Sequence, residues 1–363
     1  KRWFRHFIEV RDSDGAERCL ISAIQTKPDP LQLADIMFAA ATDHRYLDAG
    51  HVLDFTNKAF EALDVIGWDM AEGVLASLVP LYAKATRMEE RSSWRHPIDL
   101  TKILDRSFIE IPSSLETGRK KRRSWEADKS LVDTLLGDKP DQIADILLNA
   151  IRDGANELEL AASVEYASAL RIAHFGTSNE FSDWDTALHS YTFSHAVNQC
   201  LRRLTSVELL RGVFDAAMSI YLNRFLNVPS SPIPTSQQNT EEPDTLDKKF
   251  LEVLDKRQQV SEAAEIIVNY VKSGGDAKRF LAILGKALLR EDRSFHSIQM
   301  IEVAFRQWKM LHQTKVSLLD QSPILVAAAR FLAAHSPTVR HQGQMFEIAW
   351  RLQHGVKIYE GIE

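Results

Sequence analysis

Residues 29–41 read DPLQLADIMFAAA, and this stretch decides the fold class. Asp29 is a residue type that caps helix N-termini, and Pro30 suits the first helical position because its ring fixes a helical φ. Apolar residues then return every three or four positions: Leu31, Ala34, Met37 and Ala41. Because a helix turns once in about 3.6 residues, this spacing predicts an amphipathic helix over residues 30–41.

The same spacing recurs along nearly all of the chain. It predicts further helices over residues 52–66, 71–83, 143–151, 158–175, 187–204, 207–226, 247–254, 260–271, 277–288, 296–311, 325–334 and 342–352. The early residues 3–24 allow a β-hairpin around Asp14-Gly15 or two helices, and the helical steps of Trp3, Phe7 and Val10 favour the helices. We therefore expect an all-α fold, a large multi-helix bundle. The succession of helix pairs keeps an α-solenoid-like array open as the alternative.

A Pro-rich segment separates two helical regions. Residues 229–245, PSSPIPTSQQNTEEPDT, hold four prolines and almost no large apolar side chain. Such a composition is typical of a linker or a surface loop. We expect a main helical part over residues 1–228 that carries most of the candidate histidine site, and a loop or linker over residues 229–246. A second helical part over residues 247–363 would pack on the first.

Composition narrows the functional classes. Acidic residues number 50 against 44 basic ones, a net charge of −6 that argues against a surface made for nucleic acid. No apolar run approaches the roughly 20 residues that cross a bilayer, so we expect no membrane association. Two cysteines, Cys19 and Cys200, cannot form a disulfide framework, which indicates a reducing, cytoplasmic location. The chain begins at Lys1 without a signal-peptide pattern, which leaves room for a further domain at either end.

The first candidate metal ligands are His44 and His51, since imidazole is the commonest protein ligand for transition metals. The glycine between them disfavours one helix through both, so we expect His44 in the turn over residues 42–46 and His51 in the first turn of the next helix. Asp48 and Asp54 lie close enough in sequence to orient an imidazole. The alternative is a structural histidine capped by aspartate at a helix end. For His51 the sequence supports the two interpretations equally, and for His44 it favours the structural one.

A second pair of candidates, His189 and His195, lies in residues 187–196, ALHSYTFSHA. Six residues leave the two rings about 120° apart around a regular helix. A π-bulge would bring the rings closer, or the two could face one cavity from opposite sides. Asp185, one turn before His189, is placed to orient its ring.

Two further residues complete the set of candidates. His296 opens a predicted helix, and its metal partners would have to come from elsewhere in the fold. Glu165 falls on a stripe of small, apolar residues, so we expect its carboxylate to be buried. A buried carboxylate needs a cation, a metal or a proton, which makes Glu165 a candidate ligand, with a purely structural role as the alternative.

Motifs of several other enzyme classes are missing from the sequence. The chain has no G-x-G-x-x-G, no G-x-x-x-x-G-K-[ST], no H-E-x-x-H and no G-x-S-x-G. The paired E-x-x-H helices of carboxylate-rich di-iron proteins are also missing. Iron held mainly by histidines therefore agrees better with this chain than a carboxylate-rich di-iron site does.

Four short runs resemble a large uncharacterised helical family, some members of which are joined to a Rieske-type ferredoxin module. The runs are residues 43–51 (DHRYLDAGH), 92–97 (SSWRHP), 189–195 (HSYTFSH) and 295–296 (FH). This resemblance covers most of the chain. More distantly, and on the short histidine-containing segments alone, the chain is similar to questin oxidase-like proteins, which are helical oxygenases that cleave anthraquinone rings.

The distant resemblance implies a non-haem iron, or another transition metal, that activates dioxygen for ring oxidation or cleavage. By position, it implies four ligands: His51, His189, His195 and His296. The sequence carries no Rieske cysteine–histidine pattern of its own. Electrons would therefore come from a separate ferredoxin or Rieske protein, or from a domain outside this chain.

We expect a metal-dependent oxidoreductase, an oxygenase acting on an aromatic or polyketide-like small molecule, and we assign no catalytic residue. Candidate pocket residues, each of which core packing would also explain, are Tyr46, Phe55, Trp184, Tyr191 and Phe193. The alternative is a helical interaction scaffold, or a regulatory domain without catalysis, whose histidines are satisfied in the core.

Overall fold

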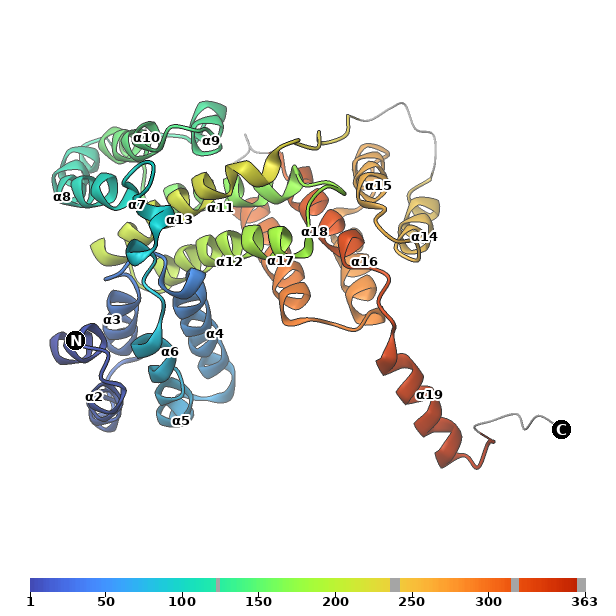
Figure 1. Ribbon diagram of the computed structural model, residues 1–363, viewed down its shortest axis with the longest axis horizontal. Coiled ribbons are helices and arrows are strands. Elements are labelled where there is room, and N and C mark those ends of the chain that lie inside the picture. Colours follow the sequence, from blue (N-terminus) through green and yellow to red (C-terminus); the bar gives the residue numbers. More distant parts are fainter. Residues whose placement is uncertain (122–124, 236–241, 315–319, 358–363) are drawn as a thin grey trace. The chain divides into compact units, whose positions relative to one another are not determined.

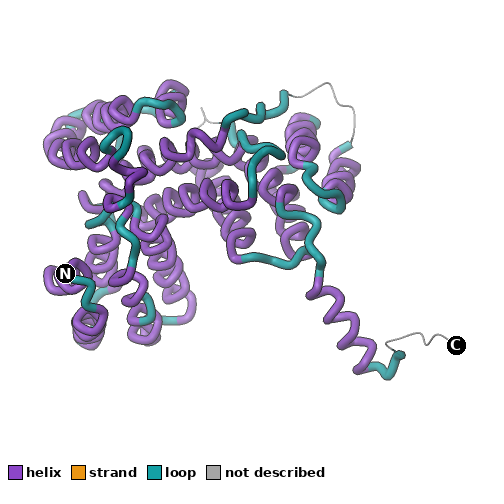
Figure 2. The backbone as a smooth tube through the Cα atoms, viewed as in Figure 1, coloured by secondary structure: helices purple, strands orange, loops and turns teal. Residues whose placement is uncertain are grey.

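The computed structural model describes residues 1–363 except 122–124, 236–241, 315–319 and 358–363. Within the described ranges the regular elements are helices and there is no strand, as Figure 2 shows. The expected all-α, multi-helix bundle is therefore confirmed. Among the same residues, none of the helices combines the length and the hydrophobicity needed to span a bilayer.

The chain divides into two compact units. The first holds residues 1–171, 186–228 and 311–319, and the second holds residues 172–185, 229–310 and 320–363. One unit boundary thus falls at residue 228, directly before the Pro-rich segment. Residues 236–241 of that segment lie outside the described part of the chain.

The helices of the first unit range from 4 residues in α7 to 23 residues in α12, and all of them except α1 are labelled in Figure 1. Their bounds are α1 (Arg2–Glu9), α2 (Ser13–Gln25), α3 (Pro30–Ala41), α4 (His51–Ile66), α5 (Ala71–Ala76), α6 (Val79–Lys84), α7 (Ser92–Arg95), α8 (Leu100–Arg119), α9 (Lys129–Leu135), α10 (Pro140–Asp153), α11 (Glu157–Ala173), α12 (Phe181–Arg203) and α13 (Val207–Leu222). Short 3₁₀ turns are η1 (Leu47–Gly50), η2 (Trp68–Met70), η3 (Met88–Glu90) and η4 (Asn223–Asn227). The last two residues of α11 and the first five of α12 belong to the second unit.

The start of α3 follows the sequence prediction. The Asp29 carboxylate accepts the Leu31 N–H at 2.7 Å, and the Gln32 side chain accepts the Asp29 N–H at 3.2 Å. This reciprocal capping box satisfies N–H groups that have no partner inside the helix, so α3 begins at Pro30. The ambiguous early residues form α1 and α2, which confirms the helical interpretation over the hairpin.

The core of the first unit lies around α13. Residues 212–221 of this helix are all buried, and α13 packs on α3, α8, α9 and α10. The helices α8 and α10 lie side by side (Figure 1). The sequence analysis does not predict α8, whose central Pro112 removes a backbone donor and normally marks the end of a helix.

The second unit is helical as well. Its remaining helices are α14 (Pro243–Val253), α15 (Val260–Lys272), α16 (Ala277–Arg290), α17 (Phe295–Thr314, of which residues 311–314 belong to the first unit), α18 (Ser322–Ala334) and α19 (His341–Gln353). Residues 323–333 of α18 are buried, and α18 packs on α15 and α16. Within α18, the buried Arg330 donates to the carbonyls of Ala173 and Phe175 at 2.6 and 3.0 Å, which satisfies acceptors at the end of α11.

Candidate metal centre

A turn of unusual backbone conformation precedes α4. Tyr46, Asp48 and Ala49 have φ values of 45°, 50° and 54°, and Gly50 has φ 91°. Left-handed backbone is unfavourable for residues other than glycine, and it clusters at functional sites where the surroundings impose it. At Gly50 a Cβ atom would lie 2.7 Å from the Phe193 Cβ, so only glycine allows this approach. The helix α4 can therefore begin at His51, as the sequence predicts.

Arg45 anchors this turn to the core of the first unit. Its guanidinium donates to the carbonyls of Thr42 and Asp43 at 2.9 and 2.8 Å, and to the Asp215 carboxylate at 3.2 Å. Asp215 is fully buried. Burial raises the pKa of Asp215 to about 7, although the adjacent Arg45 opposes the rise. The turn is thus held by an ion pair in which one partner titrates near neutrality.

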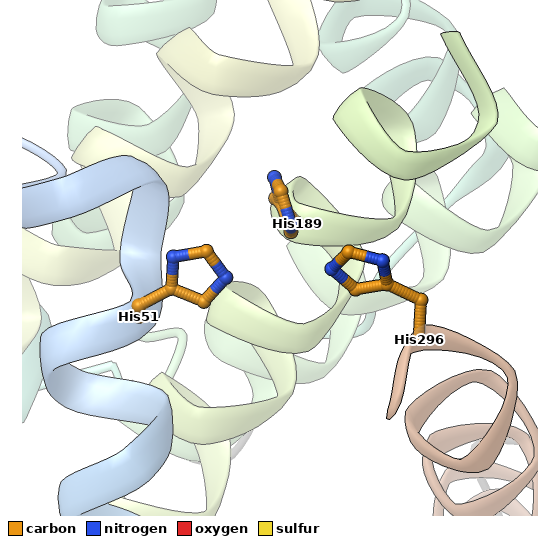
Figure 3. Close-up of side chains that lie close together, drawn as sticks. All are labelled: His51, His189 and His296. Carbon is orange, nitrogen blue, oxygen red and sulfur yellow. The ribbon is translucent and has the colours of Figure 1, made fainter. Parts of the chain in front are cut away.

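His51 and His189 face each other in the first unit. Their ring centroids lie 4.5 Å apart with an interplanar angle of 70°. A ring nitrogen of each that could ligate a metal lies within 4.8 Å of the other, and both side chains are half-buried. Figure 3 shows them on the first turn of α4 and on α12. Two donors from helices 138 residues apart in sequence are thus brought to the separation that one ion could bridge.

Carboxylates lie beside two of the candidate histidines. Asp48 Oδ2 is 3.9 Å from His51 Nδ1 in the first unit. In the second unit, Asp185 Oδ1 is 3.3 Å from the Nδ1 of His296, which lies on the first turn of α17 (Figure 3). A carboxylate that accepts a hydrogen bond from one ring nitrogen fixes the tautomer and leaves the other nitrogen to face a ligand. The 3.3 Å separation at His296 is within hydrogen-bonding distance, whereas the 3.9 Å separation at His51 is not. Asp185, which the sequence analysis assigns to His189, therefore contacts His296.

His195 occupies a different environment from His189 on the same helix. It is fully buried, and its Nδ1 lies 2.8 Å from Oε1 of the fully buried Glu165 on α11. Asn198 donates to the other Glu165 oxygen at 2.6 Å. Since α12 is regular from Phe181 to Arg203, no π-bulge turns His195 toward His189. Among the described residues, the potential ligand group around His51 includes neither His195 nor Glu165.

His44 lies in the turn between α3 and η1, as expected, and contacts two carboxylates. Its Nδ1 is 2.6 Å from Glu89 and its Nε2 is 2.7 Å from Glu9. Burial would raise the pKa of Glu89, but the hydrogen bonds from His44 and from backbone N–H groups lower it overall. Both ring nitrogens of His44 are therefore engaged, which favours the structural interpretation over the ligand interpretation.

A cavity of about 510 Å³ in the first unit has His189 in its wall. Aromatic side chains line much of it, among them Tyr46, Trp94, Tyr221 and Phe225. The Tyr46 and Trp94 rings stack with centroids 6.1 Å apart. Hydrogen bonds to Ser190 and Ser219 favour ionisation of Tyr46, but the larger effect of burial raises its pKa. The phenol therefore stays neutral in the cavity wall.

Of the predicted pocket residues, Tyr46 alone lines this cavity. Phe193 packs edge-on against Tyr46, Phe55 stacks on His51, and Tyr191 is fully buried. Trp184 lies in the second unit and packs edge-on against Phe175. The sequence analysis missed Trp94, Tyr221 and Phe225 as pocket residues. It placed Tyr221 and Phe225 in one helix over residues 207–226, whereas α13 ends at Leu222 and Phe225 lies in η4; Trp94 lies in the short helix α7.

Comparison with protein families, with curated proteins and with solved structures finds no match to this chain.

Proposed function

We propose that this protein is a metal-dependent oxidoreductase whose ion is held by His51 and His189, with His296 as a third ligand. The observation that carries the proposal is the approach of His51 to His189, 4.5 Å between ring centroids, with His189 also in the wall of the aromatic cavity. A metal held there would lie where a bound molecule could reach it. His189 thus belongs both to the proposed metal ligands and to the wall of the cavity.

The donor set fits a transition metal. Imidazole nitrogens suit iron, copper, nickel and zinc, whereas calcium and magnesium prefer oxygen ligands. We include His296 as a ligand because the resemblance described in the sequence analysis implies it. Among these metals we propose iron, which the resemblance of the histidine segments implies. Three protein ligands would leave open positions, at which iron could bind and polarise dioxygen.

The cavity supports an aromatic or polyketide-like substrate. Its volume of about 510 Å³ falls within the usual range for small-molecule sites, and aromatic rings bind flat conjugated molecules well. Dioxygen would be the oxidant. The electrons would come from a separate ferredoxin or Rieske protein in the cytoplasm, where the two unpaired thiols, Cys19 and Cys200, stay reduced.

Elemental analysis of the purified protein tests the metal proposal. We expect near-stoichiometric iron in the untreated protein, or after anaerobic reconstitution with Fe(II), and loss of that iron in the double variant His51→Ala/His189→Ala. His6→Ala replaces an exposed histidine on α1 and should retain the metal. His296→Ala alone should weaken binding if the third ligand is correct.

A protein without iron, manganese or zinc after reconstitution would overturn the metal proposal. In that case the chain would be better described as a helical scaffold. His189→Ala would then change nothing except stability.

A further inference from the structure

The wall of the aromatic cavity is poor in negative charge. The lining residues that can carry a positive charge are Arg224, His96 and His189, and none of the described lining residues is Asp or Glu. The whole chain, by contrast, has more acidic than basic residues, 50 against 44. A cavity of this sign would attract an anion and repel a cation.

Arg224 is the only arginine among the described residues of this wall, and its guanidinium stacks on two aromatic rings. Its Cζ lies 3.9 Å from the centroid of the Tyr221 ring and 4.0 Å from that of Phe225. Such stacking holds the planar group in place through cation–π attraction. The two rings also belong to the cavity wall, so the guanidinium and the aromatic lining form one surface.

Most of the hydrogen-bonding capacity of Arg224 is unused. The half-buried side chain donates to the Tyr221 carbonyl at 3.0 Å, and within the described ranges it has no carboxylate partner. A guanidinium carries five N–H donors in a planar fork. The remaining donors match the two oxygens of a carboxylate, which arginine binds in a bidentate manner.

A second arginine, Arg171, adds to the positive potential around Arg224. Arg171 donates to the Asn227 side chain at 3.0 Å and to the Leu136 carbonyl at 3.2 Å, and in the described part of the chain it too lacks a carboxylate. Burial lowers the pKa of Arg171 to about 10, and the charge of the nearby Arg224 adds to this effect. Two guanidinium groups that repel each other, with no carboxylate bonded to either among the described residues, create a positive potential.

We infer that the cavity binds a planar aromatic carboxylate, with the carboxylate on Arg224 and the ring system against the Tyr46 and Trp94 side. The inference rests on the proposed function in that it names the substrate class of the same cavity. Its geometry, however, uses no metal ligand except the His189 side chain in the wall. Ligand binding can therefore be tested on metal-free protein, and its outcome is independent of the metal analysis.

The test compares 2-naphthoate with the neutral 2-naphthamide on EDTA-treated, full-length protein by isothermal titration calorimetry. We expect naphthoate to bind at least about tenfold more tightly, the range that a charge-assisted pair supplies. Arg224→Gln should bring naphthoate down to the level of naphthamide and leave naphthamide unchanged. Arg202→Gln, at an exposed arginine at the end of α12, is the matched control and should change neither.

A second variant keeps the test valid if Arg224→Gln is poorly folded. Thr186 is an exposed residue of the cavity wall, and Thr186→Glu would add the carboxylate that the wall lacks. It should weaken naphthoate binding and spare naphthamide. Equal affinities of the two probes for the wild-type protein, or no binding of either at millimolar concentration, would overturn the inference. Either result leaves the metal proposal to be decided by its own experiment.

Discussion

Two regions of the first unit treat positive charge in opposite ways. In the core, Arg45 meets the buried carboxylate of Asp215, and the imidazole of His195 meets the buried carboxylate of Glu165. In the cavity wall, Arg224 meets aromatic rings and one carbonyl, with no carboxylate among the described residues. Both regions contain basic side chains, yet among the described residues only those of the core face a carboxylate.

The difference separates groups that serve the fold from groups that can serve a ligand. A buried ionisable group without a partner costs several kcal/mol, so a pair that closes on itself is committed to structure. A half-buried guanidinium in a cavity wall lacks the stabilisation of an ion pair, and a bound anion can supply it. The comparison predicts that core substitutions change stability, whereas wall substitutions change binding.

The largest effect is expected from Glu165→Leu. Removing this carboxylate leaves His195 and Asn198 buried without their acceptor, which should lower the free energy of unfolding by about 3–5 kcal/mol. Urea denaturation followed by circular dichroism measures this loss. Glu116→Leu, at an exposed position of α8, should change stability by no more than about 0.5 kcal/mol. A similarly small loss for Glu165→Leu would remove the distinction between core and wall.

The two histidines of α12 provide the next test. His189→Ala should weaken metal binding by about 100-fold or more, since losing a ligand costs at least as much as losing an outer-shell partner. Its stability should change by less than about 1 kcal/mol because the side chain is half-buried. His195→Ala should show the reverse, with a loss of about 2–3 kcal/mol in stability and the metal retained. Metal titration and urea denaturation of both variants check this, and the opposite pattern would assign the metal to the core pair.

The Arg45–Asp215 pair predicts a pH dependence. The pKa of Asp215 is about 7 in the folded protein against 3.8 for the unperturbed side chain, so between these values the folded state holds a proton that the unfolded state releases. This contribution to stability is complete below about pH 4 and is lost as the pH rises through 7, by about 2–3 kcal/mol between pH 5 and 8.

Asp215→Asn has no such group and should lack this part of the slope. Urea denaturation of both proteins at pH 5, 6, 7 and 8 gives the difference. Parallel curves would show that Asp215 does not titrate in this range.

The smallest effect concerns the wall itself. Arg224→Gln should alter the free energy of unfolding by no more than about 1 kcal/mol, because the side chain makes one hydrogen bond, two cation–π contacts and no ion pair among the described residues. Thermal or urea denaturation without ligand measures it. A loss comparable to that of Glu165→Leu would mean that Arg224 is part of the structural framework after all.

The sequence predicted which faces are buried better than it predicted what they meet. Asp29 and Pro30 located the start of α3, and the apolar stripe around Glu165 correctly indicated its burial. Periodicity shows the inward face of a helix but not the neighbouring helix, so the contact of Glu165 with His195 could not be read from it. The Pro112 in α8 shows the converse: its packing against α10 overrides a local signal that normally ends a helix.

The candidate site was predictable only in part. The position of His51 in the first turn of α4 follows from the glycine before it, and its approach to His189 depends on how α4 packs against α12. The cavity wall combines residues of α7, α12, α13 and η4 with the turn before α4, and periodicity does not indicate which of these elements meet. The grouping of Arg224 with its aromatic neighbours could therefore not be predicted from the sequence.

The turn before α4 has one more consequence. Tyr46 faces the cavity and His51 faces His189, and only the four residues 47–50 separate them along the chain. At Gly50, the side chain that touches Phe193 is a lone hydrogen atom. Any larger residue at position 50 would push α4 away from α12, and this would move the Tyr46 phenol and the His51 imidazole together. Gly50 thus determines the positions of both the cavity residue Tyr46 and the proposed metal ligand His51.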